Sequence, residues 1–233
     1  MTKPLCIVAG VGPGNGLAFC KRFLKEGFRV AIVARSLERM TEYAQMDEQV
    51  FPFACDLSDP VAVANTFHQI IESLGTPEVT IYNAGSGVFG TALETSIEDF
   101  ESTWRLSALG LLSVSQAVVP SMLERGKGTL LVTGATASLR GGAKFAAFSS
   151  AKAAQRNLAQ SMARSLAPSG IHVALVIIDG IIDIPRTRAM FPDKPDDFFM
   201  QPDDIADTYY ALSQQNKSAW TFEVDIRANT ESW

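Results

Sequence analysis

The most evident chemistry of this chain lies in one segment, Phe145-Ala-Ala-Phe148-Ser-Ser-Ala-Lys152. Lys152 follows Phe148 by four residues, so in a helix the two side chains lie on one face and border one pocket wall. A tyrosine at position 148 would form an acid/base pair with the lysine, because a nearby ammonium favours loss of the phenol proton. Phe148 has no such proton, and this absence limits the reactions that can be expected of the site.

A glycine-rich stretch near the N-terminus indicates a binding site for phosphate groups. Gly10, Gly12, Gly14 and Gly16, with Asn15 between the last two, separate an expected strand from an expected helix. Glycines allow a tight turn and let a pyrophosphate approach the backbone, where free N–H groups and the positive helix end hold it. The spacing does not match G-x-G-x-x-G, so a glycine turn without a ligand is the alternative. Its position between strand and helix favours dinucleotide binding.

The residues after the second expected strand indicate which dinucleotide binds. An acidic residue about 20 positions beyond such a loop selects the ribose 2′-hydroxyl, whereas an arginine accommodates a 2′-phosphate. Here Ala34 is followed by Arg35 and Ser36, with no carboxylate to repel a phosphate. We therefore predict NADP(H) rather than NAD(H). The alternative is that Arg35 is a solvated charge at a strand end.

Several other polar residues are weaker candidates. We expect His68 and His172 to be structural, and no His/Cys/Asp cluster has the spacing of a metal site. Hydroxyl groups that might hold a substrate oxygen, with ordinary packing as the alternative, belong to Thr133, Thr136, Ser138, Tyr209 and Tyr210. Four cations that flank the expected pocket mouth are either solvated surface or a means of attracting an acidic substrate: Arg140, Lys144, Arg186 and Arg188.

The elements that must position these residues alternate between apolar runs and longer amphipathic segments, which is typical of βαβ units and a doubly wound parallel sheet with helices on both faces. About seven strands are expected: Leu5–Ala9, Arg29–Ala34, Val50–Ala54, Val79–Tyr82, Thr129–Thr133, His172–Ile178 and Trp220–Ile226. The expected helices are Asn15–Glu26, Leu37–Gln45, Pro60–Ser73, Ile97–Glu124, Ser149–Ala167 and Asp203–Gln214, with N-cap candidates Ser36, Ser58 and Ser96.

Two segments depart from regular structure. The helix Ile97–Glu124 should bend, because Ser107 and Gly110 interrupt it and Pro120 does not fit inside a helix. The stretch Asp183–Gln201 is rich in proline and aromatic residues, and we expect it to be a mobile lid within a single domain spanning residues 1–233.

Composition narrows the classes of partner. The 233 residues are 47% hydrophobic and carry a net charge of −5 with a pI near 5.1, which argues against nucleic acid or an anionic membrane. Three cysteines without paired spacing, at positions 6, 20 and 55, predict reduced thiols. Leu5–Ala9 follows Met1 too closely for a leader peptide, and no apolar run approaches the ~20 residues of a membrane span. We expect a soluble cytoplasmic protein.

Together these motifs resemble the short-chain dehydrogenase/reductase family over nearly the whole chain, which implies a Rossmann-like α/β fold. Gly128–Thr136 resembles the strand that ends in the catalytic serine of that family. By resemblance, the cofactor-binding set is Gly10, Gly12, Gly14, Asn15, Gly16, Arg35, Ser36, Asp56 and Leu57 at the adenine, Asn83, Ala84 and Gly85 after the fourth strand, Lys152 at the ribose, and Asp179 and Gly180 at the nicotinamide.

The catalytic positions depart from the family pattern. The family uses a tyrosine as proton donor, a serine thirteen residues earlier, and an asparagine in the long central helix. Here those positions hold Phe148, Ala135 and Ser107, so Lys152 alone remains. Enoyl reductases of the family place the tyrosine seven residues before the lysine, and that position is Phe145.

Two classes of function fit this pattern. The first is an NADP(H)-dependent oxidoreductase that acts on a small carbonyl or conjugated double-bond substrate with non-standard proton delivery, since hydride transfer depends mainly on positioning and cofactor. The second is a catalytically silent NADP(H)-binding protein, either a redox sensor or a partner subunit. The family resemblance also implies a homodimer or homotetramer.

Overall fold

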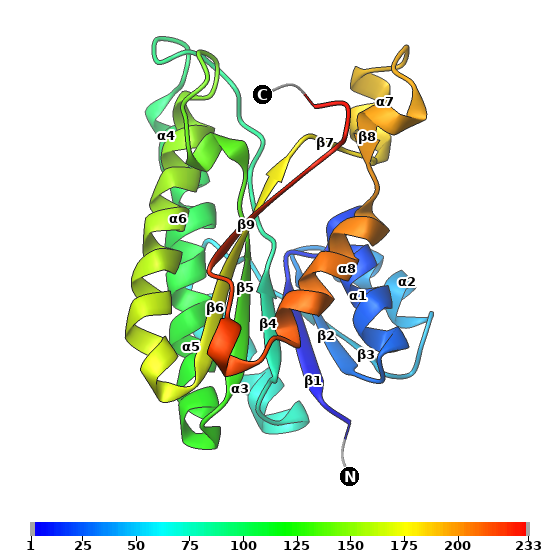
Figure 1. Ribbon diagram of the computed structural model, residues 1–233, viewed down its shortest axis with the longest axis vertical. Helices are drawn as coiled ribbons and strands as arrows, with labels where there is room; N and C mark the ends of the chain where they lie inside the picture. Colours follow the sequence, from blue (N-terminus) through cyan, green and yellow to red (C-terminus); the bar gives the residue numbers. More distant parts are fainter. Residues whose placement is uncertain (1–2, 232–233) are drawn as a thin grey trace.

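The computed structural model describes residues 3–231, and its centre is a parallel sheet of seven strands (Figure 1). The strand order is β3-β2-β1-β4-β5-β6-β9. Their bounds are β1 Leu5–Ala9, β2 Arg29–Ala34, β3 Val50–Ala54, β4 Val79–Tyr82, β5 Gly128–Thr133, β6 Ile171–Asp179 and β9 Glu223–Arg227. From β1 the chain moves outward to β2 and β3 and then returns to place β4 on the other side of β1. Ligands of open α/β sheets bind at the carboxyl ends of the strands beside such a switch point.

Helices cover both faces of this sheet, so the Rossmann-like doubly wound α/β fold expected from the sequence is confirmed. One face carries α1 Asn15–Lys25, α2 Leu37–Ala44 and α8 Pro202–Ser213, and the other carries α3 Pro60–Leu74, α5 Gly110–Arg125 and α6 Ala146–Leu166, with α4 Ile97–Trp104 beside α6 (Figure 1). Because both faces are covered, all nine residues of β6 are buried, which explains why the strands are continuous apolar runs.

The long central helix is interrupted where the sequence predicted. Between α4 and α5 the residues Arg105–Leu109 form a π-turn that includes Ser107, and Gly110 follows it. Pro120, which was expected to fit poorly inside this helical segment, lies within α5, and the interruption is at Arg105–Leu109. Pro120 and Gln116, the residue whose carbonyl loses its helical partner, are both exposed, so water can satisfy that carbonyl.

The helical run Ile97–Arg125 has the length and apolarity of a membrane-spanning segment, but 56% of its most apolar window is buried inside the fold. It therefore resembles the core helix of a globular domain.

The helix caps follow the sequence in part. Ser96 caps α4, because its Oγ accepts a hydrogen bond of 3.0 Å from the Asp99 N–H. Ser58 does not cap α3: Asp59 does, with its Oδ1 accepting from the Val61 N–H at 2.9 Å. Ser58 donates to Asp56 instead. A carboxylate directly before Pro60 displaces the hydroxyl as the cap, and proline suits the first helical position.

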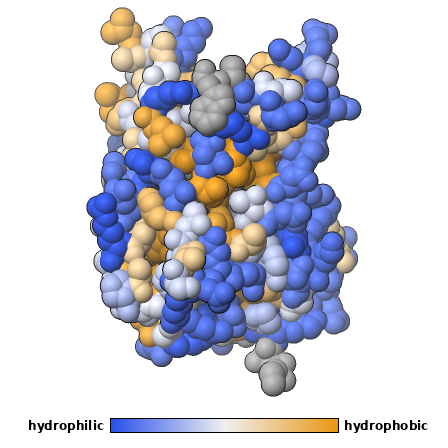
Figure 2. All heavy atoms as spheres, in the orientation of Figure 1, coloured by the Kyte–Doolittle hydropathy of each residue, from blue (hydrophilic) through white to orange (hydrophobic). Residues whose placement is uncertain are grey.

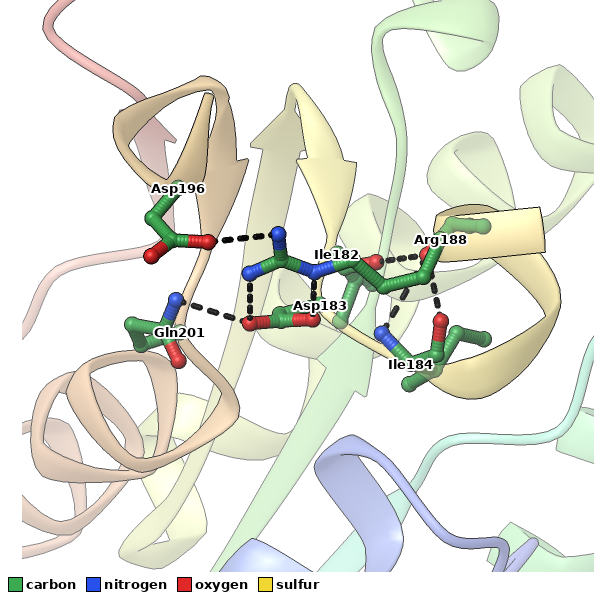
Figure 3. A network of polar contacts seen from close by, with 7 residues as sticks. Ile182, Asp183, Ile184, Arg188, Asp196 and Gln201 are labelled. Carbon is green, nitrogen blue, oxygen red and sulfur yellow. Dashed lines mark hydrogen bonds and ion pairs between the residues drawn. The ribbon is translucent and has the colours of Figure 1, made fainter. Parts of the chain in front are cut away.

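The segment expected to be an irregular lid is folded. It contains α7 Pro185–Met190 and β8 Phe199–Met200, which pairs in parallel with β7 Ile181–Ile182. Arg188 holds the segment together: its guanidinium forms two hydrogen bonds of 2.7 Å with the carboxylate of Asp183 and one of 2.7 Å with Asp196 (Figure 3). Sequence patterns could not reveal this order, since it depends on contacts between residues inside the segment.

Candidate cofactor cleft and active site

The glycine turn after β1 packs directly against the chain that leaves β4. Gly10 has φ +100°, and a Cβ there would lie 2.6 Å from the Ala84 backbone nitrogen, so only glycine fits. Asn83 donates from Nδ2 to the Gly10 carbonyl at 2.8 Å. The structure thus brings together two of the motifs noted in the sequence, at the switch point between β1 and β4.

The start of α1 is suited to an anion. Gly14 is the N-cap residue of α1. Within residues 3–231, no side chain makes a capping hydrogen bond to this helix end, and the first turn of α1 contains no acidic residue. Gly12 faces open space, and the Oδ1 of Asn15 is buried without a hydrogen-bond partner in the described part of the chain. The helix end therefore offers positive potential and N–H groups to a phosphate. On its outer side, Ile184 lies over Gly14.

The ends of β2 and β3 place Arg35 near Asp56. Asp56 accepts hydrogen bonds from the hydroxyl and the backbone N–H of Ser58, at 2.7 and 2.9 Å, and these lower its pKa, with a smaller contribution from Arg35. Arg35 and Ser36 are exposed, whereas Leu57 is buried. A cationic and hydrogen-bonding edge therefore lies beside the glycine turn.

Lys152 is a buried cation with fixed partners. Its ammonium donates to the Thr133 carbonyl at 2.8 Å and to Gln155 Oε1 at 2.9 Å. Burial lowers the pKa of Lys152 to about 8. A Cβ on Gly85 would lie 3.5 Å from Nζ, so the ammonium stands directly against the chain segment that follows β4.

The π-turn accepts the last hydrogen bond of the network that begins at Lys152. Two consecutive carbonyls in it accept side-chain hydrogen bonds: Leu106 from the Tyr82 hydroxyl, and Ser107 from Gln155 Nε2 at 3.1 Å. π-turns disturb the helical ladder and often occur at functional sites. The Ser107 hydroxyl is fully buried and has no partner among the described residues. Position 107 therefore touches the lysine network through its backbone, by way of Gln155.

The hydroxyl candidates are already engaged within the protein. Tyr209, fully buried, donates to Thr133 Oγ1 at 2.8 Å, and Thr133 in turn donates to Asn83 Oδ1 at 3.0 Å. Thr136 donates to Asp179 Oδ1 at 2.6 Å and Ser138 to the Ala135 carbonyl at 2.6 Å. Tyr210 packs against α1, with its ring 5.6 Å from that of Phe23 and under the Arg22 guanidinium.

Asp179, at the end of β6, is part of an ion pair that the sequence did not reveal. Its Oδ2 lies 3.2 Å from Arg227 Nη2, and its Oδ1 accepts from Thr136. Gly180 follows with φ +153°, and a Cβ there would lie 2.8 Å from Met200 Sδ. The segment after β6 is therefore held on one side by Arg227 and on the other by the folded lid.

A cavity of about 580 Å³ lies beyond this ion pair, between the lid, the start of α8 and the end of β9. Figure 2 shows hydrophobic atoms on the floor of the hollow in this part of the surface. Its lining combines apolar side chains with carboxylates and one cation: Phe199, Met200, Ile205 and Ile226 with Asp196, Asp197, Asp204 and Arg227.

Phe148 belongs to an aromatic cluster. Its ring centroid lies 5.8 Å from that of Phe89 and 6.3 Å from that of Phe145, and Phe89 and Phe145 are 5.2 Å apart. The rings meet because Gly90 pairs with the chain before α6, donating to the Lys144 carbonyl at 2.8 Å. This half-exposed surface includes position 148, at which a tyrosine would have supplied a phenol proton. Its rings carry no polar group.

The histidines and cysteines lie outside the cleft. His68 is exposed beside Glu72, and His172 is buried, stacked on Trp220 and bonded to the Thr221 carbonyl. The three cysteines are buried free thiols, and burial raises the pKa of Cys20 to about 12. Within residues 3–231, no cluster of three metal-ligating side chains occurs.

A glycine turn at the switch point of a 3-2-1-4-5-6 parallel sheet defines a Rossmann-like nucleotide-binding architecture. Residues 5–194 match the family model described as short chain dehydrogenase, and the chain belongs to that family. The 2-(R)-hydroxypropyl-CoM dehydrogenase of Xanthobacter autotrophicus is 31% identical over 192 residues, which are 79% of this chain and 76% of that one.

Solved structures agree with this assignment. A short-chain dehydrogenase from Rhodopseudomonas palustris is 35% identical and superposes with a TM-score of 0.83, covering 96% of this chain and 98% of that one. An alcohol dehydrogenase from the archaeon Thermococcus sibiricus, complexed with 5-hydroxy-NADP, is 25% identical with a TM-score of 0.88, covering 99% and 98%.

Proposed function

We propose that the protein is an NADP(H)-dependent oxidoreductase that acts on a small carbonyl or conjugated double-bond substrate without a phenolic proton donor. The observation that carries the proposal is the buried ammonium of Lys152, which is held by two acceptors and stands against Gly85, directly after the Ala84 backbone on which the Gly10 turn packs. A buried cation costs free energy, so its retention favours a ligand-directed role.

The residues around the cleft fit a dinucleotide phosphate. The open side of Gly12 and the uncapped N-terminus of α1 suit the pyrophosphate end, and the exposed Arg35 suits a 2′-phosphate. The relative complexed with an NADP derivative supports NADP(H) as the dinucleotide. The remaining proposed contacts are Gly10, Gly14, Gly16, Ser36, Asp56, Leu57, Asn83, Ala84, Gly85, Lys152, Asp179 and Gly180.

When bound, a reduced nicotinamide supplies a hydride, which is two electrons and one hydrogen, to an electrophilic carbon. The protein's own residues position the substrate and supply the proton. With its pKa near 8, Lys152 is mostly charged at neutral pH and can give one proton through water to the reduced product. A conjugated substrate spreads its negative charge and needs a strong acid less than a ketone does. Ser107 contributes through its carbonyl, which holds the Gln155 side chain that contacts Lys152.

A catalytically silent NADP(H)-binding protein is the second candidate, and one observation favours it. Thr133, Thr136 and Ser138 all donate their hydroxyl hydrogens to protein acceptors, so none is left to hold a substrate oxygen. A redox sensor or a partner subunit would have no need of such a group.

One experiment separates the two functions. The protein is titrated with NADPH and with NADH by fluorescence, and NADPH oxidation is then followed over panels of ketones, aldehydes and enones. Tighter binding of NADPH together with turnover of any panel member supports the oxidoreductase. Binding without turnover supports the silent protein, and no binding of either nucleotide refutes both.

We also propose self-association and a reducing cellular compartment, such as the cytoplasm. Exposed apolar side chains on α4 and α5, including Phe100, Trp104 and Leu112, support a helix-built interface, and three free thiols suit reducing conditions. A purely monomeric mass in sedimentation equilibrium at micromolar concentration would contradict the first of these proposals.

A further inference from the structure

The four cations that flank the expected mouth differ in their partners. Arg188 is held by Asp183 and Asp196 and is not available to a ligand (Figure 3). Arg186, two residues earlier on the same short helix, is exposed, and within residues 3–231 no carboxylate pairs with it. Lys194, the other exposed cation of the lid, lies 4.8 Å from the centroid of the Phe198 ring, whereas Arg186 is directed toward Gly87.

Arg186 reaches from the lid to the loop that follows β4. A Cβ on Gly87 would lie 3.1 Å from Arg186 Nη2, so the guanidinium fits there because residue 87 has no side chain. The same Cβ position is 3.5 Å from Cε2 of Phe89. The cation therefore stands beside the first ring of the aromatic cluster.

The aromatic cluster continues from this point toward Lys152. Phe89 and Phe145 are 49% and 38% exposed, which is high for large rings that touch one another. Phe148 joins them and precedes Lys152 by one helical turn on α6. A molecule lying on these rings would have one end near Arg186 and would approach the lysine along α6.

We infer that the substrate of the proposed oxidoreductase is a planar apolar carboxylic acid, such as an aromatic or unsaturated acid, whose carboxylate is bound by Arg186. A planar guanidinium fork matches a carboxylate, and aromatic rings bind flat hydrocarbon surfaces. In a chain of net charge −5, an unpaired arginine beside exposed rings gives local attraction for an anion that the whole surface would otherwise repel. The inference depends on the proposed function for the reaction and deepens it by naming the substrate class.

The test compares two probes of the same shape, trans-cinnamate and its neutral isostere cinnamamide. Binding of each is measured by calorimetry and by saturation-transfer NMR, with the protein alone and with saturating NADP⁺. We expect cinnamate to bind about tenfold more tightly than cinnamamide, since a hydrogen bond to a charged group is stronger than one between neutral groups. The preference should shrink in 1 M salt, because an exposed ion pair is screened.

Three variants identify the groups responsible. Arg186→Met should abolish the preference for cinnamate, while Arg186→Lys should keep part of it. Phe89→Leu should weaken both probes alike. Arg164→Met, which removes an exposed cation near the far end of α6, is the matched control and should change neither affinity.

Several results would overturn the inference. Equal affinities for the two probes would do so, as would a cinnamate preference that survives Arg186→Met with a circular dichroism spectrum like that of the parent. If neither cinnamate nor cinnamamide binds to a protein that still binds NADPH, the substrate class is refuted and the proposed cofactor function is not. Failure of NADPH itself in the same titration is the separate result that refutes the proposed function.

Discussion

Lys152 Nζ lies 2.9 Å from Gln155 Oε1, and both side chains are buried on the same face of α6. The Gln155 side chain is fully buried, and its amide nitrogen donates a hydrogen bond to the Ser107 carbonyl. A single side chain therefore joins the ammonium to the π-turn between α4 and α5. This relationship fixes the direction of the lysine and leaves its remaining N–H free to face Gly85.

Substitutions at Gln155 should move the pKa of Lys152 in opposite directions. Gln155→Leu removes an acceptor from the ammonium and should lower that pKa below about 8, whereas Gln155→Glu places a carboxylate there and should raise it. Both lose the donor to the Ser107 carbonyl and should cost about 1–3 kcal/mol of stability. Lysine ¹³Cε chemical shifts followed against pH, with Lys152→Met for assignment, measure the first effect. Parallel shifts in the two variants would show that Gln155 does not control the lysine.

The buried ammonium should also make stability depend on pH. The unfolded lysine keeps its proton up to pH about 10.5, while the folded one releases it near 8. Between these values the unfolded state binds more protons, so the free energy of unfolding attributable to Lys152 rises with pH, by up to about 3 kcal/mol. Urea denaturation of the parent and of Lys152→Met from pH 7 to 10.5 measures the difference. If the difference in the free energy of unfolding between the parent and Lys152→Met stays constant across that pH range, Lys152 is not a buried charge with a lowered pKa.

Restoring the absent hydroxyls should increase carbonyl reduction. In Phe148→Tyr combined with Ala135→Ser, the new phenol would lie one helical turn from Lys152, whose charge favours release of the phenol proton. We expect NADPH-dependent reduction of ketones to rise about 10²–10⁴-fold, the usual contribution of a positioned acid. Each single variant serves as a control and should gain less. An inert double variant that still binds NADPH would mean that the pocket is shaped for other chemistry.

Arg35 should determine the choice of nucleotide. Arg35→Ala should weaken NADPH binding by about tenfold or more and leave NADH binding nearly unchanged, since only NADPH carries the 2′-phosphate. Fluorescence titration measures both affinities. Lys25→Ala, which removes an exposed cation at the far end of α1, is the control for a general loss of positive charge. Equal weakening of NADPH and NADH binding would show that Arg35 does not contact the 2′-phosphate.

Arg188 should stabilise the lid more than the whole fold. Its partner contacts are partly solvent-exposed, so Arg188→Met should change global stability little. Amide hydrogen exchange in residues 183–201 should nevertheless become faster, because the lid loses the group that joins Asp183 to Asp196. Arg186→Met has no such partners and should leave the exchange rates unchanged. Unaltered exchange in Arg188→Met would show that strand pairing alone orders the lid.

The sequence predicted the sheet well for a physical reason. Strands such as β1 and β2 have both faces covered, so each is a nearly continuous apolar run, and their limits agree with the expected ones. The position of Gly10 was also predictable, since a positive φ next to a close backbone contact requires glycine.

Contacts between distant residues were not predictable in this way. Gln155 was overlooked because a glutamine in a helix is usually on the surface, although its position one turn after the buried Ala151 and one before Ala159 was a signal. The partner of Asp179 is Arg227, on a strand 48 residues later, and no local pattern links them. The engagement of Thr133 by Tyr209 likewise depends on how α8 packs against the sheet.

The π-turn fixes the rotational relation between the two halves of the central helix. Each residue of an α-helix turns the chain by about 100°, so deleting one residue from Arg105–Leu109 would swing α4 by that angle relative to α5. Phe100 and Trp104 would then leave the outward face on which they now stand. A local irregularity that contacts Gln155, the partner of Lys152, thus sets which apolar side chains α4 presents at the surface, so a change in the lysine network would also change that surface.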